Sequence, residues 1–273
     1  MSFFKNKVVA ITGGSEGIGK ALIEVLIPLG AKIATCARNY DKLYTLQLQY
    51  SNVMLHIMTC DVSNQQDCRR FIDSTIATFG GIDILVNNAG INIRGFFKDT
   101  GVETIEKIMA TNFYGAVYCT QYALPSILER KGSIVGISSI AGYRGLPGRS
   151  GYSASKFALQ GWMEALRTEL LDTGINIMWV APGFTGSNIR QAAPIVHGEG
   201  HLSEYQPTSA GDEEKMMPAS DVAKHILTAI EKKKRNLVLT FNGKRTVFVN
   251  KLFPAWADKL VNRFFIKDGK LIK

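Results

Sequence analysis

A tyrosine and a lysine four residues apart are the side chains in this sequence best suited to acid–base chemistry. Tyr152 and Lys156 are spaced so that, on a helix, the phenol and the ammonium group lie on one face. A free tyrosine titrates near pH 10, and a nearby cation favours the phenolate and lowers that pKa. To act near neutral pH, the phenol would need a pKa up to about three units lower, equivalent to about 4 kcal/mol. A phenol tuned in this way can donate a proton to a carbonyl oxygen.

Two serines add a candidate for holding the substrate of such a reaction. Ser138 and Ser139 end a short apolar run that begins at Ser133 and is typical of a buried strand. Parallel α/β sheets bind ligands at the carboxyl edge, so a hydroxyl group there could hold a carbonyl. A Tyr-x-x-x-Lys spacing alone is a common accident on helices, and these serines strengthen its chemical interpretation.

A glycine-rich turn near the start of the chain indicates a dinucleotide site. Thr12 is followed by Gly13, Gly17 and Gly19, between a short apolar run and a stretch of helical periodicity. Glycines allow a tight turn and a close approach of the backbone to a pyrophosphate at a helix N-terminus. The spacing is Gly-x-x-x-Gly-x-Gly, which differs from the common Gly-x-Gly-x-x-Gly pattern.

The end of the second apolar run bears on which dinucleotide is bound. An NAD site commonly has a carboxylate about 20 residues after the glycines, but here the sequence reads Cys36, Ala37, Arg38 and Asn39. A guanidinium would bind a 2′-phosphate through charge-assisted hydrogen bonds, whereas a carboxylate would repel it. We therefore predict NADP(H), with Arg38 and Ser15 near the phosphate. The alternative is that Arg38 is an ordinary surface arginine.

These candidates lie among segments that alternate between strand-like and helix-like periodicity. Such alternation predicts parallel strands joined by crossover helices, and continuous apolar runs suit strands covered on both faces. The predicted fold class is α/β, a single-domain Rossmann-like doubly wound parallel sheet of about seven strands flanked by helices. The predicted strands are 7–12, 31–37, 53–60, 82–86, 133–138, 175–180 and 237–240, and the predicted helices run from the glycine turn to 29 and over 41–48, 64–79, 102–130, 152–172 and 219–232.

Two segments depart from this alternation. Residues 186–218 have the weakest periodicity, and a long irregular loop after the sixth strand is typical of a substrate-binding segment. We assign residues 1–240, including this loop, to a catalytic domain and residues 241–273 to a basic amphipathic extension. In the loop, His197 and His201 could suggest a metal pair, but glycine neighbours disfavour a helix and no third ligand is evident, so no metal is predicted.

Composition excludes several classes of protein. Of the 273 residues, 46% are hydrophobic and 20% are charged, which excludes a disordered, collagen-like or disulfide-scaffold chain. The four cysteines form no Cys-x-x-Cys pair, and we interpret them as small buried residues in a reducing compartment. Strand-like sequence begins at Lys7 and no apolar run is long enough to span a bilayer. The sequence therefore predicts no signal peptide, no transmembrane helix and a cytoplasmic location.

The net charge of +9 is unevenly distributed along the chain. Residues 231–273 hold 12 Lys and Arg against 3 Asp and Glu, whereas residues 1–230 are neutral overall. The segment 251–267 interleaves Leu, Phe, Trp and Ile with cations, as interfacial helices do, which predicts peripheral contact with an anionic membrane. The alternatives are a solvated tail, or apolar positions packed on the body or on a partner subunit. Nucleic acid is not predicted, because no nucleic-acid motif accompanies the charge.

Together the motifs resemble those of the classical short-chain dehydrogenase/reductase family. The matching pieces occur in family order and at family spacing across about 1–240. They are Thr12-Gly13-x-x-x-Gly17-Ile18-Gly19, Asp61-Val62, Asn87-Asn88-Ala89-Gly90, Asn112, Ser138-Ser139, Tyr152-x-x-x-Lys156 and Pro182-Gly183.

The resemblance implies a role for each matching residue. Tyr152 is expected to be the general acid in reduction and the base in oxidation, while Lys156 lowers its pKa and binds the nicotinamide ribose. The family's serine lies 13 residues before the tyrosine, which selects Ser139 over Ser138. Asn112 is expected to anchor a water that relays protons past Lys156. For the cofactor, the resemblance implies that Asp61 and Val62 hold the adenine, that Asn88, Ala89 and Gly90 line its ribose, and that Pro182, Gly183 and Thr185 hold the nicotinamide.

Two departures from the family pattern bear on the cofactor. Glu16 precedes Gly17, where many NADP-preferring relatives have a basic residue, so Arg38 must carry most of the preference for NADP. Thr185 comes three residues after Pro182, whereas family members often have a threonine four or five residues beyond that proline.

The predicted function is that of an NADPH-dependent oxidoreductase. Hydride would pass between nicotinamide and the carbonyl carbon of a hydrophobic ketone or aldehyde, giving an alcohol, while Tyr152 exchanges the proton. The alternative is a non-catalytic NADP(H)-binding regulator or scaffold, against which the joint presence of Asn112, Ser139, Tyr152 and Lys156 argues. The resemblance also implies a homodimer or homotetramer.

Overall fold

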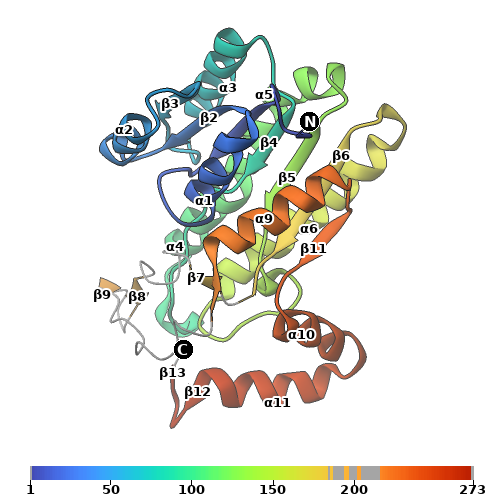
Figure 1. The fold of residues 1–273 in the computed structure, drawn as a ribbon. Coiled ribbons are helices and arrows are strands. Elements are labelled where there is room, and N and C mark those ends of the chain that lie inside the picture. Colours follow the sequence, from blue (N-terminus) through green and yellow to red (C-terminus); the bar gives the residue numbers. More distant parts are fainter. Residues whose placement is uncertain (1, 184, 187–193, 197–201, 204–215, 272–273) are drawn as a thin grey trace.

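The central element is a seven-stranded sheet in which every neighbouring pair of strands is parallel (Figure 1). The computed structural model describes residues 2–183, 185–186, 194–196, 202–203 and 216–271. The strand order is β11-β6-β5-β4-β1-β2-β3, which confirms the doubly wound fold. The strands are β1 (Val8–Thr12), β2 (Lys32–Ala37), β3 (Leu55–Thr59), β4 (Ile84–Asn87), β5 (Ser133–Ile137), β6 (Asn176–Ala181) and β11 (Asn236–Val238).

Helices cover both faces of this sheet, because successive strand residues point to opposite sides. In β1, Val9 and Ile11 belong to the core under one helical layer, whereas Ala10 between them belongs to the core under the other. The first layer contains α1 (Gly17–Leu26) and α9 (Ala219–Glu231), and the second contains α3 (Gln65–Phe79), α5 (Gly115–Glu129) and α6 (Ser150–Glu169), while α2 (Tyr40–Gln49) packs beside β3.

The helix predicted over 102–130 is interrupted by a π-helical turn. It consists of α4 (Val102–Met109), the π turn over 110–114 and α5. The apolar periodicity hides the break because the three segments continue one another. Asn112 lies in the π turn, a rare feature that occurs frequently at functional sites.

The remaining elements are short. Single 3₁₀ turns occupy 27–29, 97–99, 140–142 and 171–173. In the loop predicted over 186–218, β7 (Thr185–Gly186) pairs with β10 (Met217–Pro218), and β8 (Ile195–Val196) pairs with β9 (Leu202–Ser203). His197 and His201 lie outside the described residues.

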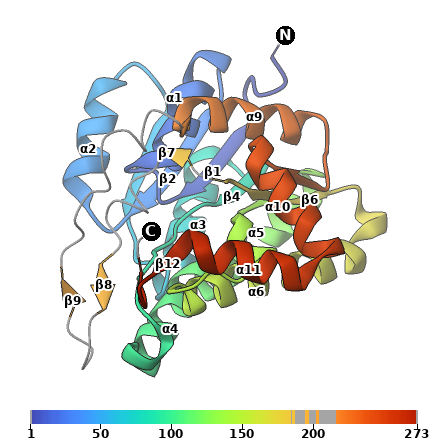
Figure 2. The same cartoon turned by 90° about the horizontal axis from the view of Figure 1, so that it is seen from below.

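The C-terminal extension folds back across the carboxyl edge of the sheet. It forms α10 (Phe241–Leu252), α11 (Pro254–Phe265) and a hairpin of β12 (Ile266–Lys267) and β13 (Lys270–Leu271) (Figures 1 and 2). Asn250 accepts a hydrogen bond from Arg144 at 3.0 Å and donates one to the Tyr143 carbonyl at 3.0 Å. Arg144 also pairs with Asp258. Over the described residues, none of the helices has the length and apolarity needed to cross a membrane.

The four cysteines are free and buried, as the sequence predicts. Cys36, Cys60, Cys68 and Cys119 are distant in the sequence, yet side-chain hydrogen bonds join neighbouring thiols along this series. They belong to the core beneath α3 and α5.

Candidate active site

The predicted site residues gather at one edge of the sheet, because each of the six strands β1 to β6 is followed by one of them. Parallel strands place their carboxyl ends at the same edge, and β1 and β4 form the switch point where ligands bind in such folds. A cleft of about 1150 Å³ follows this edge. Its lining includes Gly13, Ser15, Gly17, Ile18, Arg38, Asp61, Val62, Asn88, Ala89, Gly90, Ser139, Tyr152, Lys156, Pro182, Gly183 and Thr185. Gly19 and Asn112 lie behind this lining.

The glycine turn is packed so closely that side chains would not fit. Gly13 has a φ of +70°, and a Cβ there would lie 2.9 Å from the Ala89 Cα. A Cβ on Gly19 would lie 2.3 Å from the Gly13 carbonyl oxygen and 2.6 Å from the Asn88 amide nitrogen. Gly19 therefore allows α1 to pack on the turn.

The loop after β4 is joined to this turn by hydrogen bonds. Asn88 donates its side-chain amide to the carbonyls of Thr12 at 2.9 Å and Gly13 at 3.0 Å. The Thr12 hydroxyl accepts hydrogen bonds from the backbone nitrogens of Asn88 and Ala89, both at 3.0 Å. These hydrogen bonds thus join the turn after β1 to the loop after β4, and the two segments together form the floor of the cleft.

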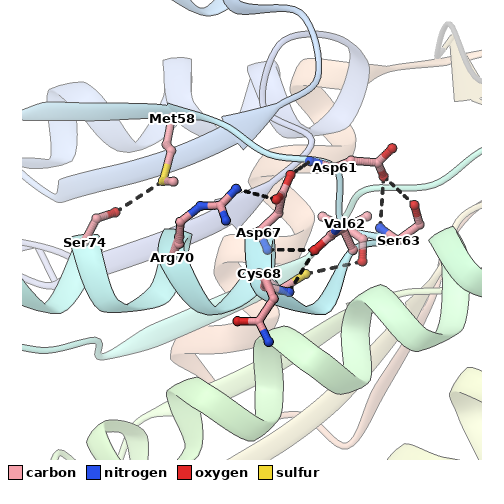
Figure 3. Close-up of polar contacts among 10 residues, drawn as sticks. Met58, Asp61, Val62, Ser63, Asp67, Cys68, Arg70 and Ser74 are labelled. Carbon is pink, nitrogen blue, oxygen red and sulfur yellow. Dashed lines mark hydrogen bonds and ion pairs between the residues drawn. The ribbon is translucent and has the colours of Figure 1, made fainter.

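Asp61 is held in the turn between β3 and α3 (Figure 3). Its Oδ1 accepts hydrogen bonds from the backbone nitrogen of Ser63 at 3.0 Å and from the Ser63 hydroxyl at 2.7 Å. The backbone nitrogen of Asp61 donates to Asp67 at 3.0 Å, and the Cys68 thiol donates to the Val62 carbonyl at 3.3 Å. These contacts fix both predicted adenine-binding residues at the wall of the cleft.

The charges around the predicted 2′-phosphate position include one that the sequence analysis missed. Arg38 is exposed and lines the cleft. Glu16 forms an ion pair with Lys42 of α2, and both also line the cleft. The lysine therefore balances the carboxylate that departs from the family pattern. No local motif indicates Lys42, because the pair joins residues 26 positions apart.

The two serines after β5 make different contacts. The Ser138 hydroxyl accepts a hydrogen bond from Gln160 at 2.7 Å and donates to the Lys156 carbonyl at 3.3 Å. The Ser139 hydroxyl accepts from the backbone nitrogen of Ala141 at 3.2 Å. It is Ser139 that forms a side-chain hydrogen bond with Tyr152. Of the two serines, Ser139 is therefore the one that contacts Tyr152, which is the serine that the family resemblance selects.

The pKa of Tyr152 is raised in this structure, contrary to the net lowering that its spacing from Lys156 predicts. Burial raises the pKa of Tyr152 above its ordinary value, while the Ser139 hydrogen bond and the Arg149 charge lower it by less. The Lys156 ammonium instead donates to the Ile137 carbonyl at 2.8 Å and lies 5.6 Å from the centre of the Tyr152 ring. Burial lowers the pKa of Lys156 itself to about 8. For both side chains, the effect of desolvation on the pKa is therefore larger than that of the attraction between the phenolate and the ammonium group.

Asn112 acts on the wall of the cleft through Ile91. Its side-chain oxygen accepts from the Ile91 backbone nitrogen at 2.7 Å, and its amide donates to the Ile91 carbonyl at 2.9 Å. The same amide donates to the Ser155 hydroxyl at 3.0 Å. The π turn thus joins α6 to the segment after Gly90. The predicted contact with a relay water stays a prediction.

The far end of the cleft is formed by residues that the sequence analysis assigned differently. The apolar stripe of α11 faces the cleft, as in the alternative that apolar positions pack on the body, and contact of the segment 251–267 with a membrane stays a prediction. The spacing i, i+3, i+4, i+7, i+8 was readable in the sequence, but the direction of the stripe depends on how α11 packs. The residues are Ala257, Leu260, Val261, Phe264 and Phe265. The buried Arg149 guanidinium lies 5.7 Å from the centre of the Phe265 ring.

Comparison with known proteins identifies the family. Residues 7–195 match the family model described as short chain dehydrogenase. The chain belongs to the short-chain dehydrogenase family. This short-chain dehydrogenase is 34% identical over 261 residues to Dehydrogenase/reductase SDR family member 7B of Mus musculus, covering 93% of this chain and 79% of the relative. It is also 31% identical to the uncharacterized oxidoreductase YxnA of Bacillus subtilis, covering 95% of this chain and 72% of the relative.

Solved structures of two other dehydrogenases share its fold. One from Burkholderia phymatum, in complex with NAD, has a TM-score of 0.80 and 24% identity, covering 94% of this chain and 96% of that one. An alcohol dehydrogenase from the archaeon Thermococcus sibiricus, complexed with 5-hydroxy-NADP, has a TM-score of 0.73 and 22% identity, covering 86% and 96% respectively.

Proposed function

We propose that this short-chain dehydrogenase reduces hydrophobic ketones or aldehydes with NADPH. The observation that carries the proposal is the meeting of Ser139, Tyr152 and Lys156 on the wall of the cleft that begins at the glycine turn. β5 supplies the serine at its carboxyl end, and the first two turns of α6 supply the tyrosine and the lysine.

The glycine end of the cleft fits a dinucleotide. α1 begins at Gly17, so the positive end of its dipole adjoins a turn in which the glycines leave no room for a Cβ at Gly13 or Gly19. The solved relatives include one complex with NAD and one with 5-hydroxy-NADP, so the fold accommodates both kinds of dinucleotide. When bound, NADPH supplies the hydride that reduces the carbonyl carbon. The residues expected to hold it are those of the glycine turn with Asp61, Val62, Asn88, Ala89, Gly90, Pro182, Gly183 and Thr185.

The charges near the adenine end favour the 2′-phosphorylated form. Arg38 is exposed at the cleft, and Lys42 is paired with Glu16 beside it. The group of three therefore keeps one net positive charge, which suits a phosphate, and its carboxylate, that of Glu16, is already paired with Lys42.

The proton is handled by Tyr152. Because its pKa is raised, the phenol is protonated at neutral pH and can donate to the oxygen of a carbonyl that accepts hydride. The Ser139 hydroxyl lies within hydrogen-bonding range of the phenol and is placed to bind the same oxygen. The Lys156 ammonium, held by the Ile137 carbonyl, stabilises the phenolate that remains after proton transfer.

The preference for a hydrophobic substrate follows from the opposite wall of the cleft. Leu146, Val249, Leu260, Val261 and Phe264 line it. Apolar walls with a few convergent polar groups are typical of sites that bind small apolar ligands.

The test is NADPH oxidation, followed by its absorbance, over carbonyl compounds from short aldehydes to long-chain and steroid ketones. We expect turnover with the hydrophobic members, and Tyr152→Phe should lower kcat/KM by about 10²- to 10⁴-fold. NADPH affinity should be retained in that variant, because the phenol oxygen is removed while the ring stays. Tight NADPH binding with no turnover of any carbonyl would instead favour a non-catalytic regulator.

A further inference from the structure

The basic residues near the end of the chain form two separate groups in the structure. Lys232, Lys233 and Lys234 lie between α9 and the start of β11, at the amino-terminal edge of the sheet (Figure 1). α10 follows β11 and lies at the opposite, carboxyl edge. The excess charge that is continuous in the sequence is therefore split between the two ends of the molecule.

At the carboxyl edge, α10 presents an exposed apolar stripe. Phe241, Phe248 and Leu252 are 80%, 62% and 52% exposed. At 100° per residue they fall within an arc of about 40° on the helix. The stripe continues through the exposed side chains of Phe253 and Trp256, where α10 turns into α11.

Cations flank this stripe on both sides. Lys244 and Lys251 lie on one side and Arg245 on the other, and all three are exposed. Residues 232–257 contain no Asp or Glu. We name these eight residues the α10 face: Phe241, Lys244, Arg245, Phe248, Lys251, Leu252, Phe253 and Trp256. Arg245, at the edge of the stripe, lines the cleft together with Thr246 and Val249, whereas Phe241, Phe248 and Leu252 are not among the residues of its lining.

We propose that the α10 face docks on the surface of an anionic lipid bilayer. Large apolar and aromatic side chains flanked by Lys and Arg are the chemistry of helices that lie in a membrane interface. Each lysine or arginine near an anionic surface adds electrostatic attraction that salt screens. Docking is peripheral, since the helices of the described residues do not span a membrane.

A second copy of the chain fits this face less well than a bilayer does. A two-fold interface would place the face against itself, bringing the same three cations together. The face carries no carboxylate to pair with them, because Asp258, the acid next to it in the sequence, pairs with Arg144. Like charges placed opposite each other disfavour association, whereas anionic headgroups satisfy the cations and the acyl region accepts the stripe.

The docked face adjoins the mouth of the cleft. Leu260 and Phe264 of α11 are partly exposed and also line the cleft. A bilayer in contact with the α10 face would therefore lie beside the apolar wall, and lipophilic substrates could enter from it. This last consequence rests on the proposed function, whereas docking itself does not.

The first experiment measures sedimentation of the full-length protein with vesicles. At low salt, we expect the protein to pellet with vesicles that contain phosphatidylcholine and 30% phosphatidylglycerol, to remain in solution with phosphatidylcholine alone, and to be released by high salt. Phe253→Ser with Trp256→Ser should lower the bound fraction at least tenfold. Phe97→Ser, a matched change of an exposed phenylalanine outside the face, should leave binding unchanged.

Charge reversals separate the face from net charge. Lys244→Glu with Lys251→Glu should abolish sedimentation, while Lys232→Glu with Lys234→Glu, which alters net charge equally at the other end of the molecule, should retain most of it. Tryptophan fluorescence adds a second readout. Brominated lipid in anionic vesicles should quench part of the emission, and this part should be absent in Trp256→Phe.

Three results would overturn the proposal. One is no retention by anionic vesicles at low salt. Another is a dimer, measured by light scattering, that dissociates when Phe253 and Trp256 are replaced. The third is binding to DNA that depends on the α10 face and competes with the vesicles. Sedimentation does not need turnover, so an absence of reductase activity would leave this test intact.

Discussion

The two ends of the cleft are built in different ways. At the cofactor end, backbone groups and short side chains hold the turn after β1 against the loop after β4, with four hydrogen bonds from Asn88 and Ala89 to Thr12 and Gly13. At the substrate end, the wall comes from α10, α11 and the segment around Leu146. That segment is distant in the sequence from the two helices. The first end is specified by local motifs, whereas the second exists only once the chain has folded.

The physical difference is the kind of fit that each end requires. A pyrophosphate needs close approach of the backbone, which demands glycine at particular positions. An apolar wall needs volume and hydrophobicity, which many side chains supply about equally well. Substitutions should therefore have larger effects at the cofactor end, and the following changes measure that contrast.

The largest effect is expected for Gly19→Ala. Its Cβ would lie 2.3 Å from the Gly13 carbonyl, so the turn must move. We expect NADPH affinity to fall more than 100-fold and the melting temperature to drop, measured by titration and calorimetry. Gly161→Ala is the control, because a Cβ there meets no atom within 4 Å and alanine suits the interior of α6. That variant should be more stable by roughly 0.5–1 kcal/mol. Similar behaviour of the two variants would refute the close packing.

Lys156→Met tests the cost of burying a charged lysine where the cofactor end and the substrate end of the cleft meet. Burial lowers the pKa of Lys156 from its ordinary 10.5 to about 8, so the charged form is disfavoured in the folded state. Below about pH 8 this destabilisation is fully present. Between about pH 8 and 10.5 the folded state alone loses the proton, and stability rises with pH. Lys156→Met should therefore raise the free energy of unfolding at pH 7 by roughly 2–3 kcal/mol, after allowance for the lost hydrogen bond.

The gain in stability should shrink as the pH approaches 10.5, and reductase activity should be lost. Chemical denaturation at pH 7 and at pH 10 measures the difference. A variant that is less stable than the native protein at pH 7 would contradict the assigned burial cost.

Arg38→Asp probes the charge at the cofactor end. Loss of a charge-assisted hydrogen bond to the 2′-phosphate, together with repulsion, should weaken NADPH binding by about 10- to 100-fold, equivalent to about 1.5–3 kcal/mol. NADH affinity, measured on the same sample, is the internal control and should be unchanged or improved. An equal loss of affinity for NADPH and NADH would show that Arg38 does not bind the 2′-phosphate.

The smallest effect is expected at the substrate end, for Leu260→Ala. This side chain is partly exposed where it lines the cleft, so its truncation removes part of one apolar contact. The KM for a long-chain ketone should rise by about fivefold, with that for a short aldehyde and the NADPH affinity unchanged. A large loss of NADPH affinity would show that the two ends are more tightly coupled than their contacts indicate.

Much of the fold and part of the site were predictable because their signals are local. All seven strands were predicted to within two residues at each end, since continuous apolar runs mark strands that are covered on both faces. The π turn around Asn112 was not predictable from periodicity, and the contact that Asn112 makes there is with Ile91, 21 residues away in the sequence. Lys42 was missed because its partner Glu16 lies in the glycine turn, 26 residues away in the sequence.

The sequence by itself determined the parallel sheet and the placement of the site residues at its carboxyl edge. Strand–helix alternation allows little else, and most of the motifs directly follow a strand, while Asn112, Tyr152 and Lys156 lie on the helical segments. Tertiary structure alone decided that the Tyr152 pKa is raised and that the stripe of α11 faces the cleft while that of α10 faces outward. Both outcomes depend on how much solvent the surrounding elements exclude, and that exclusion arises only when segments distant in the sequence pack together.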